Sequence, residues 1–185
     1  MTTAILLAAT LAWADPVAAR DPLIGDASIH VGTPESGAVA WLGESVGLAA
    51  GVRTDLGATE VMGTWRRSLT RPDRWGIDVH GAAGLGVGLV KPVPYISTVF
   101  GLHGRYRGER LGWSVGAVMP AAATVTGPTP IRVPILVESM LSLRIGNVAP
   151  GLRLATGAVI TPGLPPSFAA QAGLGLTIWQ GSDSP

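Results

Sequence analysis

Seven charged or titratable residues in this chain have the types and spacing of a buried ion-pair network. They are Glu60, Arg66, Asp78, His80, Arg105, Arg107 and Glu138. A carboxylate between two guanidiniums keeps its charge compensated in a narrow, partly dry space. We predict that Arg66, Asp78 and Arg107 lie side by side on three adjacent strands, with His80 and Arg105 one step along. The two glutamates are expected deeper on the same inward face.

Two interpretations of this network stay open. In the first, the ion pairs fill the interior of a small β-barrel and fix the register of its strands. In the second, the excess of arginine makes the lumen a minor passage that favours anions. A barrel of eight strands has room for side chains rather than for an aqueous channel, whereas ten strands would leave more room.

Catalytic and metal-binding alternatives have little support in the sequence. His103 and Ser114 can be neighbours on adjacent strands, and a nucleophile, a base and an orienting acid must lie within hydrogen-bond reach for catalysis. Beyond that possible contact nothing indicates an active site, so we predict no catalytic residues and no enzyme. The histidines His30, His80 and His103 are too scattered for a metal site. We expect no metal and no cofactor.

A glycine-rich stretch at residues 84–88 looks superficially like a phosphate-binding loop. Its glycines alternate with Leu85 and Val87 inside an apolar segment. That alternation favours a strand whose glycines make room in the lumen, rather than a nucleotide-binding loop.

The residues of the network must be positioned by strands, and the clearest strand runs from Ile131 to Ile145. One parity carries only apolar residues and one serine, and the other parity carries Arg132, Glu138 and Arg144. A period of two places successive side chains on opposite faces of a strand. Pro134 is the exception, because a proline in a strand marks an edge or a bulge.

The rest of the chain repeats this alternation. We predict eight strands, at residues 45–53, 56–69, 74–90, 95–107, 111–125, 131–145, 151–161 and 167–179. An N-terminal hairpin at 26–32 and 38–42, with its turn at Pro34–Gly37, would raise the number to ten. Each predicted strand has roughly the 9–11 residues that cross a bilayer obliquely. The fold class is therefore all-β, a closed antiparallel up-and-down transmembrane β-barrel.

Composition indicates which face of the strands points outward. The chain is 47% hydrophobic and 14% charged, with a mean hydropathy of +0.40 and a net charge of +1. No stretch supplies the roughly 18 apolar residues of a membrane-spanning helix. The polar parity is mostly Gly, Ala, Ser and Arg, which suits a crowded lumen better than a water-facing surface. The alternative is a soluble periplasmic β-barrel that binds an apolar ligand inside. The small net charge gives no argument for nucleic acid.

Four aromatic residues are predicted to gather near one rim and to face outward. They are Trp65, Trp75, Tyr106 and Trp113. An aromatic girdle at a membrane interface accounts for this clustering.

The first 19 residues have the pattern of a secretory signal peptide. Ala4–Ala12 is a short apolar core, and cleavage is expected after Ala14 or after Ala19. Residues 20–180 would then form the single barrel domain, and residues 181–185 a disordered tail. The chain has no cysteine, which excludes disulfides and a lipid-modified cysteine anchor.

With these features the chain resembles small bacterial outer-membrane β-barrels of the OmpA/OmpX type. Its last strand is similar to the C-terminal assembly signal of such proteins, through Gly173, Leu176, Ile178 and Trp179. It departs from that pattern in Ala172, where a polar residue is usual, and in the residues that follow Trp179. The resemblance implies a monomer in the outer membrane of a Gram-negative bacterium, with both termini in the periplasm. Its partners would be the lipid bilayer and the outer-membrane assembly machinery.

Overall fold

A computed structural model of the chain describes most of the predicted barrel. The described residues are 25–33, 35–42, 45–53, 58–71, 74–89, 92–125, 133–161 and 163–179. The predicted signal peptide and the predicted tail lie outside these ranges, so both stay predictions.

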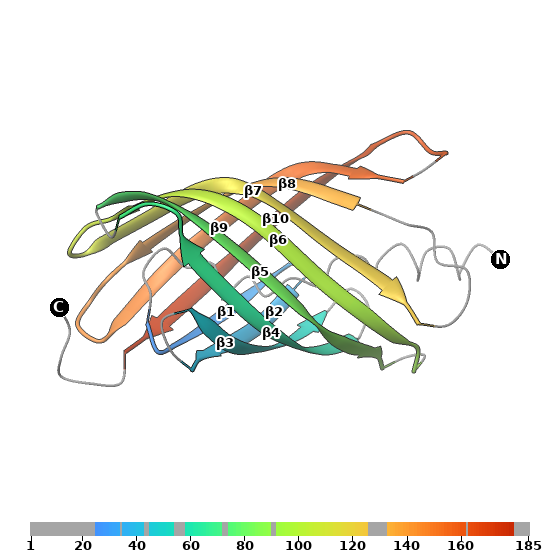
Figure 1. The fold of residues 1–185 in the computed structure, drawn as a ribbon, viewed down its shortest axis with the longest axis horizontal. Helices are drawn as coiled ribbons and strands as arrows, with labels where there is room; N and C mark the ends of the chain where they lie inside the picture. Colours follow the sequence, from blue (N-terminus) through green and yellow to red (C-terminus); the bar gives the residue numbers. More distant parts are fainter. Residues whose placement is uncertain are drawn as a thin grey trace.

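The structure is a closed barrel of ten antiparallel strands in up-and-down order (Figure 1). The strands are β1 (Ala27–Thr33), β2 (Glu35–Trp41), β3 (Val46–Arg53), β4 (Ala58–Ser68), β5 (Trp75–Gly88), β6 (Pro94–Arg107), β7 (Leu111–Thr124), β8 (Val133–Leu143), β9 (Val148–Ile160) and β10 (Ser167–Ile178). Each strand pairs with its neighbours in sequence, and β1 closes the barrel by pairing with β10 from Ala27↔Ile178 to Thr33↔Ala172. The N-terminal hairpin therefore joins the wall, and the larger of the two predicted strand numbers is correct. No described segment contains a helix that is long and apolar enough to cross a membrane.

The two rims of the barrel differ in what they carry. The proximal rim holds the ends of β1 and β10 that lie nearest the chain termini, together with the turns β2–β3, β4–β5, β6–β7 and β8–β9. The distal rim holds the other five connections.

Two predicted details are wrong at the strand ends. Glu35, Ser36 and Gly37 were expected in a turn but open β2, where they pair with Arg53, Val52 and Gly51 of β3. The predicted turn at 146–150 is shorter, because β9 already begins at Val148. Ladder hydrogen bonds on both sides outweigh the local turn preference of glycine and proline in these segments.

The predicted span of 9–11 residues is also wrong on two sides of the barrel, where the strands are shorter or longer. Strands β1, β2 and β3 have 7, 7 and 8 residues, whereas β5, β6 and β7 have 14 each. The wall is therefore low at β1–β3 and tall at β5–β7.

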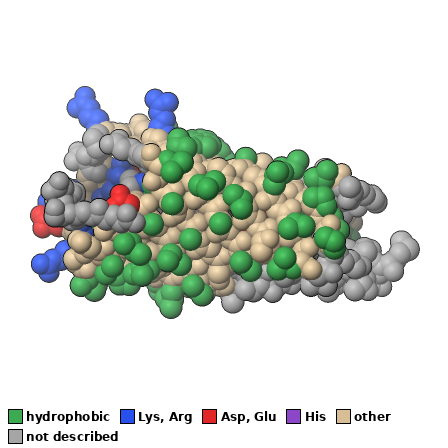
Figure 2. Space-filling model, turned by 90° about the horizontal axis from the view of Figure 1, so that it is seen from below, with side chains coloured by type: hydrophobic (Ala, Val, Ile, Leu, Met, Phe, Trp, Pro, Cys, Tyr) green, Lys and Arg blue, Asp and Glu red, His purple; other side chains and the backbone are tan. Residues whose placement is uncertain are grey.

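The apolar faces of the strands point outward, as the alternation predicts. Large apolar side chains such as Val61, Leu85 and Val137 are 53%, 67% and 55% exposed. The polar residues between them point inward, and Glu138 and Ser97 are fully buried. Figure 2 shows hydrophobic side chains spread along the outer wall, with the charged side chains gathered at one end. This distribution is the reverse of a water-soluble barrel.

The lumen contains a belt of apolar side chains, which we call the apolar layer. Every strand except β1 contributes one buried residue to it: Val39, Ala49, Met62, Ala82, Val99, Val118, Leu136, Val159 and Ala169. Trp41 packs against this belt from the proximal side. The layer divides the lumen into a proximal half and a distal half.

Two prolines coincide with the end of one ladder. The β7–β8 pairing stops at Val118↔Leu136, and Pro120 and Pro134 lie beyond that pair. Both prolines are fully buried. A proline has no N–H to donate, so it is tolerated where the ladder opens. The prediction that Pro134 marks an irregularity is confirmed.

Candidate functional site

The carboxylate of Asp78 lies between two guanidiniums in the proximal half of the lumen. It is 2.6 Å from Nε of Arg105 and 3.1 Å from Nη2 of Arg107. Arg105 also donates from Nη2 to Oγ of Ser68, at 2.7 Å. The side chains of Asp78 and Arg107 are 18% and 27% exposed, whereas Arg105 is buried. This part of the network is therefore open to solvent at its outer end.

Glu138 forms the centre of a second, fully buried group. Its Oε1 is 2.8 Å from Nε2 of His103, and Nε of Arg153 donates to its Oε2 at 2.8 Å. The three side chains are at most 5% exposed. A buried carboxylate is expected to hold a compensating charge and full hydrogen bonding. Arg153 supplies this charge from β9.

Arg153 was not among the residues predicted for the network, and His103 was considered as a possible neighbour of Ser114. The signal was available, because Arg153 shares its parity in β9 with the buried residues Ala149, Ala155 and Val159. Alternation alone would have placed its guanidinium in the lumen.

The predicted neighbours of Asp78 are only partly correct. Arg66 lies opposite His80 rather than Asp78, and Asp78 lies opposite His103 rather than Arg107. The two registers are displaced by two and by four residues from the predicted ones. Even displacements keep every side chain on its predicted face. The guanidinium of Arg66 instead stacks on the ring of Trp41, 3.9 Å from its centroid.

Two histidine rings, one from β5 and one from β6, pack against each other in the proximal half of the lumen. His80 and His103 have their ring centroids 4.9 Å apart, tilted by 31°. His80 lies opposite Gly101, and a Cβ at that glycine would collide with the imidazole. The close approach of the ring therefore requires glycine at position 101.

The distal half is filled by different chemistry. Glu60 is 4% exposed and accepts hydrogen bonds from Oγ of Ser97 at 3.0 Å and from the hydroxyl of Tyr95 at 3.4 Å. The Tyr95 ring lies over Gly86, which has no side chain to block it. The glycine-rich stretch at 84–88 therefore serves lumen packing, and that prediction is confirmed. Glu60 is separated from the other predicted network residues by the apolar layer.

The contact between His103 and Ser114 that catalysis would require is not formed. Ser114 lies opposite Arg105 and Met140, and its buried Oγ has no hydrogen-bond partner among the described residues. His103 contacts Glu138 instead.

The aromatic residues face outward on the proximal side. Trp65, Trp75 and Trp113 are 43%, 64% and 37% exposed. The rings of Trp75 and Tyr106 pack with centroids 4.8 Å apart and planes tilted by 52°, and Nε1 of Trp113 donates to Oγ of Ser139. We call these four residues the aromatic girdle.

The last strand ends at the same rim. In β10, Leu174 and Leu176 face outward and Gly173 and Thr177 face inward. The N–H of Trp179 donates to the carbonyl of Asn147 at 3.0 Å. The strand is thus built into the wall, and recognition of its C-terminal residues by assembly machinery stays a prediction.

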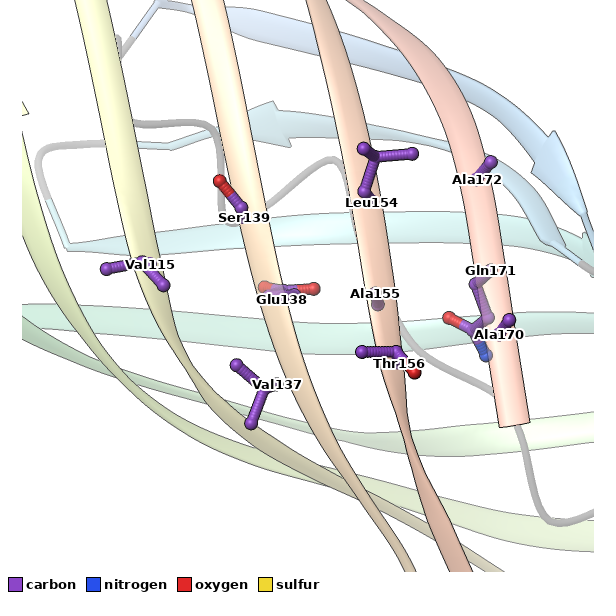
Figure 3. A pocket seen from close by; sticks show the side chains of 10 residues that line it. All are labelled: Val115, Val137, Glu138, Ser139, Leu154, Ala155, Thr156, Ala170, Gln171 and Ala172. Atoms are coloured by element: carbon purple, nitrogen blue, oxygen red, sulfur yellow. The ribbon is translucent and has the colours of Figure 1, made fainter. Parts of the chain in front are cut away.

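A hollow of about 540 Å³ lies on the outer wall across β7–β10 (Figure 3). Most of its lining side chains belong to the outward parity: Val115, Val137, Ser139, Leu154, Thr156, Ala170 and Ala172. Small residues of β10 lie here beside larger ones of β7–β9. The hollow is therefore a depression in the apolar wall, not a chamber of the lumen.

No protein-family model matches the chain, and no curated protein matches its sequence.

Proposed function

We propose that this protein is an integral β-barrel of the outer membrane of a Gram-negative bacterium, with a structural role and a closed lumen. The observation that carries the proposal is the orientation of the wall. Large apolar side chains cover its outside, and polar and titratable side chains line much of its inside. Such a wall is stable where lipid surrounds it.

Exposure to water would make this wall costly. Burying apolar surface is worth roughly 25 cal/mol per Å², so leaving dozens of large apolar side chains in water forfeits that gain. Exposed apolar patches of this extent mark a membrane or protein contact. The closed barrel also leaves no edge strand among the described residues, so its backbone groups pair between strands as hydrocarbon requires.

A lumen blocked by the apolar layer favours a structural role over the passage of ions or small solutes. Beyond the charged groups of the proximal half, the apolar layer presents Met62, Val118 and Leu136, each at most 1% exposed. An apolar constriction excludes water and ions by dewetting. The charged groups of the proximal half and the close packing of the apolar layer leave little room for an apolar ligand, so a ligand-carrying soluble barrel is not favoured.

Extraction of the full chain from cells tests the membrane assignment. We expect the protein to stay in the carbonate-insoluble membrane fraction and to migrate faster on a gel without boiling than after boiling. Recovery in the soluble fraction would overturn the proposal.

A single substitution tests the same assignment on the wall itself. Val137→Arg places a charge on the outer wall at the height of the apolar layer. In a bilayer this charge should lower the free energy of unfolding by about 2–4 kcal/mol. Leu164→Arg is the matched control, because Leu164 is 60% exposed in the β9–β10 turn. In a water-facing wall both variants would change the unfolding free energy by about 0.5 kcal/mol or less. Urea unfolding in vesicles, followed by gel mobility, measures the difference.

A further inference from the structure

Arginines outside the lumen gather at the proximal rim. Arg67, Arg71, Arg74 and Arg110 are exposed and Arg144 is half-buried. They come from the end of β4 and from the turns β4–β5, β6–β7 and β8–β9. We call these five residues the arginine collar, and Figure 2 shows basic side chains projecting from one end of the wall.

The backbone brings members of the collar close to one another and to further arginines. The N–H of Arg144 donates to the carbonyl of Arg110 at 2.6 Å, and the N–H of Arg107 donates to that of Arg74 at 2.7 Å. Like charges on neighbouring strands repel each other. In the described part of this rim, the carboxylates outside the lumen are Asp26 and Glu109. Among the described residues of this rim, cationic charge is therefore in excess.

The collar lies at the edge of the aromatic girdle. Arg74 directly precedes Trp75, and Arg67 follows Trp65 by two residues on the same outward parity. The guanidinium of Arg144 lies 4.5 Å from the ring centroid of Trp179. Aromatic girdles mark the level where hydrocarbon meets headgroups. In a bilayer the guanidiniums would thus stand at the level of lipid phosphates.

We infer that the arginine collar binds the phosphates of anionic phospholipid headgroups in the leaflet at the proximal rim. This inference rests on the proposed membrane location. A guanidinium offers a planar fork that matches phosphate oxygens in a bidentate manner. The basic residues are spread over three turns and one strand end rather than concentrated in one patch. That spacing suits several small headgroups better than one acidic protein.

The test uses the quenching of the girdle tryptophans by brominated lipids. The full chain is reconstituted in vesicles of phosphatidylcholine alone and in vesicles with equal amounts of phosphatidylcholine and phosphatidylglycerol. In separate samples of the mixture, the bromine is carried by one lipid or by the other. We expect brominated phosphatidylglycerol to quench more strongly, with a preference of several-fold that declines as salt screens the charges.

Two triple variants separate phosphate binding from general attraction. Arg67→Gln/Arg71→Gln/Arg110→Gln should lower the preference to near parity. Arg67→Lys/Arg71→Lys/Arg110→Lys keeps the positive charges but removes the planar guanidinium groups. This variant should retain part of the preference for phosphatidylglycerol. Equal quenching by both lipids in the wild type, or an unchanged preference in the glutamine variant, would overturn the inference. So would tight binding of polyglutamate without lipid preference, which would indicate an acidic protein partner.

The two proposals fail in different ways. A chain that does not insert even into neutral phosphatidylcholine vesicles contradicts the membrane assignment. A chain that inserts but shows no preference for phosphatidylglycerol contradicts the collar inference alone.

Discussion

The proximal and distal halves of the lumen are filled by different means, although the same strands line both. In the proximal half, Asp78 and Glu138 each lie between cationic or imidazole partners. In the distal half, Glu60 accepts hydrogen bonds from the hydroxyls of Tyr95 and Ser97. The apolar layer separates the two.

This difference shows where single substitutions are costly. Removing one partner of a buried ion pair leaves the other charge uncompensated, which costs far more than the pair itself contributes. Removing one hydroxyl that donates to the Glu60 carboxyl breaks no ion pair and is expected to cost less. The proximal half should therefore tolerate change poorly and the distal half well.

The largest effect is expected at Glu138, which is fully buried between His103 and Arg153. Glu138→Ala leaves the Arg153 guanidinium without this carboxylate and should lower the unfolding free energy by about 3–5 kcal/mol. Urea unfolding of the reconstituted protein measures it. A loss under about 1 kcal/mol would mean that water reaches the proximal half.

The apolar layer is tested by a pair of methionine variants. Met62→Ala removes a layer residue, and Met140→Ala removes a buried residue of the proximal half. Each should cost about 2–5 kcal/mol through the cavity it leaves. Only Met62→Ala should raise ion conductance in planar bilayers above the silent wild type. Equal conductance in both variants, or an open wild-type channel, would show that the layer is not the seal.

Asp78 should be less sensitive than Glu138, because its side chain is partly exposed. Asp78→Ala removes the partner of both Arg105 and Arg107 and is expected to cost about 1.5–3 kcal/mol. Arg107→Gln removes the more exposed partner and should cost at most about 1 kcal/mol. If the order of these two losses is reversed, Arg107 rather than Asp78 is central to the group.

The smallest effect is expected in the distal half. Tyr95→Phe keeps the ring over Gly86 and removes only the hydrogen bond to Glu60. The expected cost is about 0.5–1.5 kcal/mol. A loss as large as that of Glu138→Ala would erase the contrast between the two halves. The same unfolding assay serves all four comparisons.

Much of the fold follows from local patterns. The alternation predicted the inward face of Asp78 and Glu138, the outward face of Trp65 and Trp113, and the closed antiparallel barrel. It failed at the start of β2, where a short segment with Pro and Gly carries too few alternating residues to define the strand end. Most residues of the site were predicted correctly, but their contacts were not. Arg66 lies opposite His80 rather than Asp78, and Arg153 was not predicted.

The sequence alone determined which residues face the lumen, because a period of two assigns parity to each side chain regardless of register. The tertiary structure decided which of these residues meet. Registers that differ by two or four residues give every side chain the same face, so the alternation cannot choose between them. Turn geometry and long-range pairing make that choice. They place Asp78 against Arg105 and His103 against Glu138. The apolar layer also needed the closed barrel, because its nine residues come from nine strands and become neighbours only when the sheet closes.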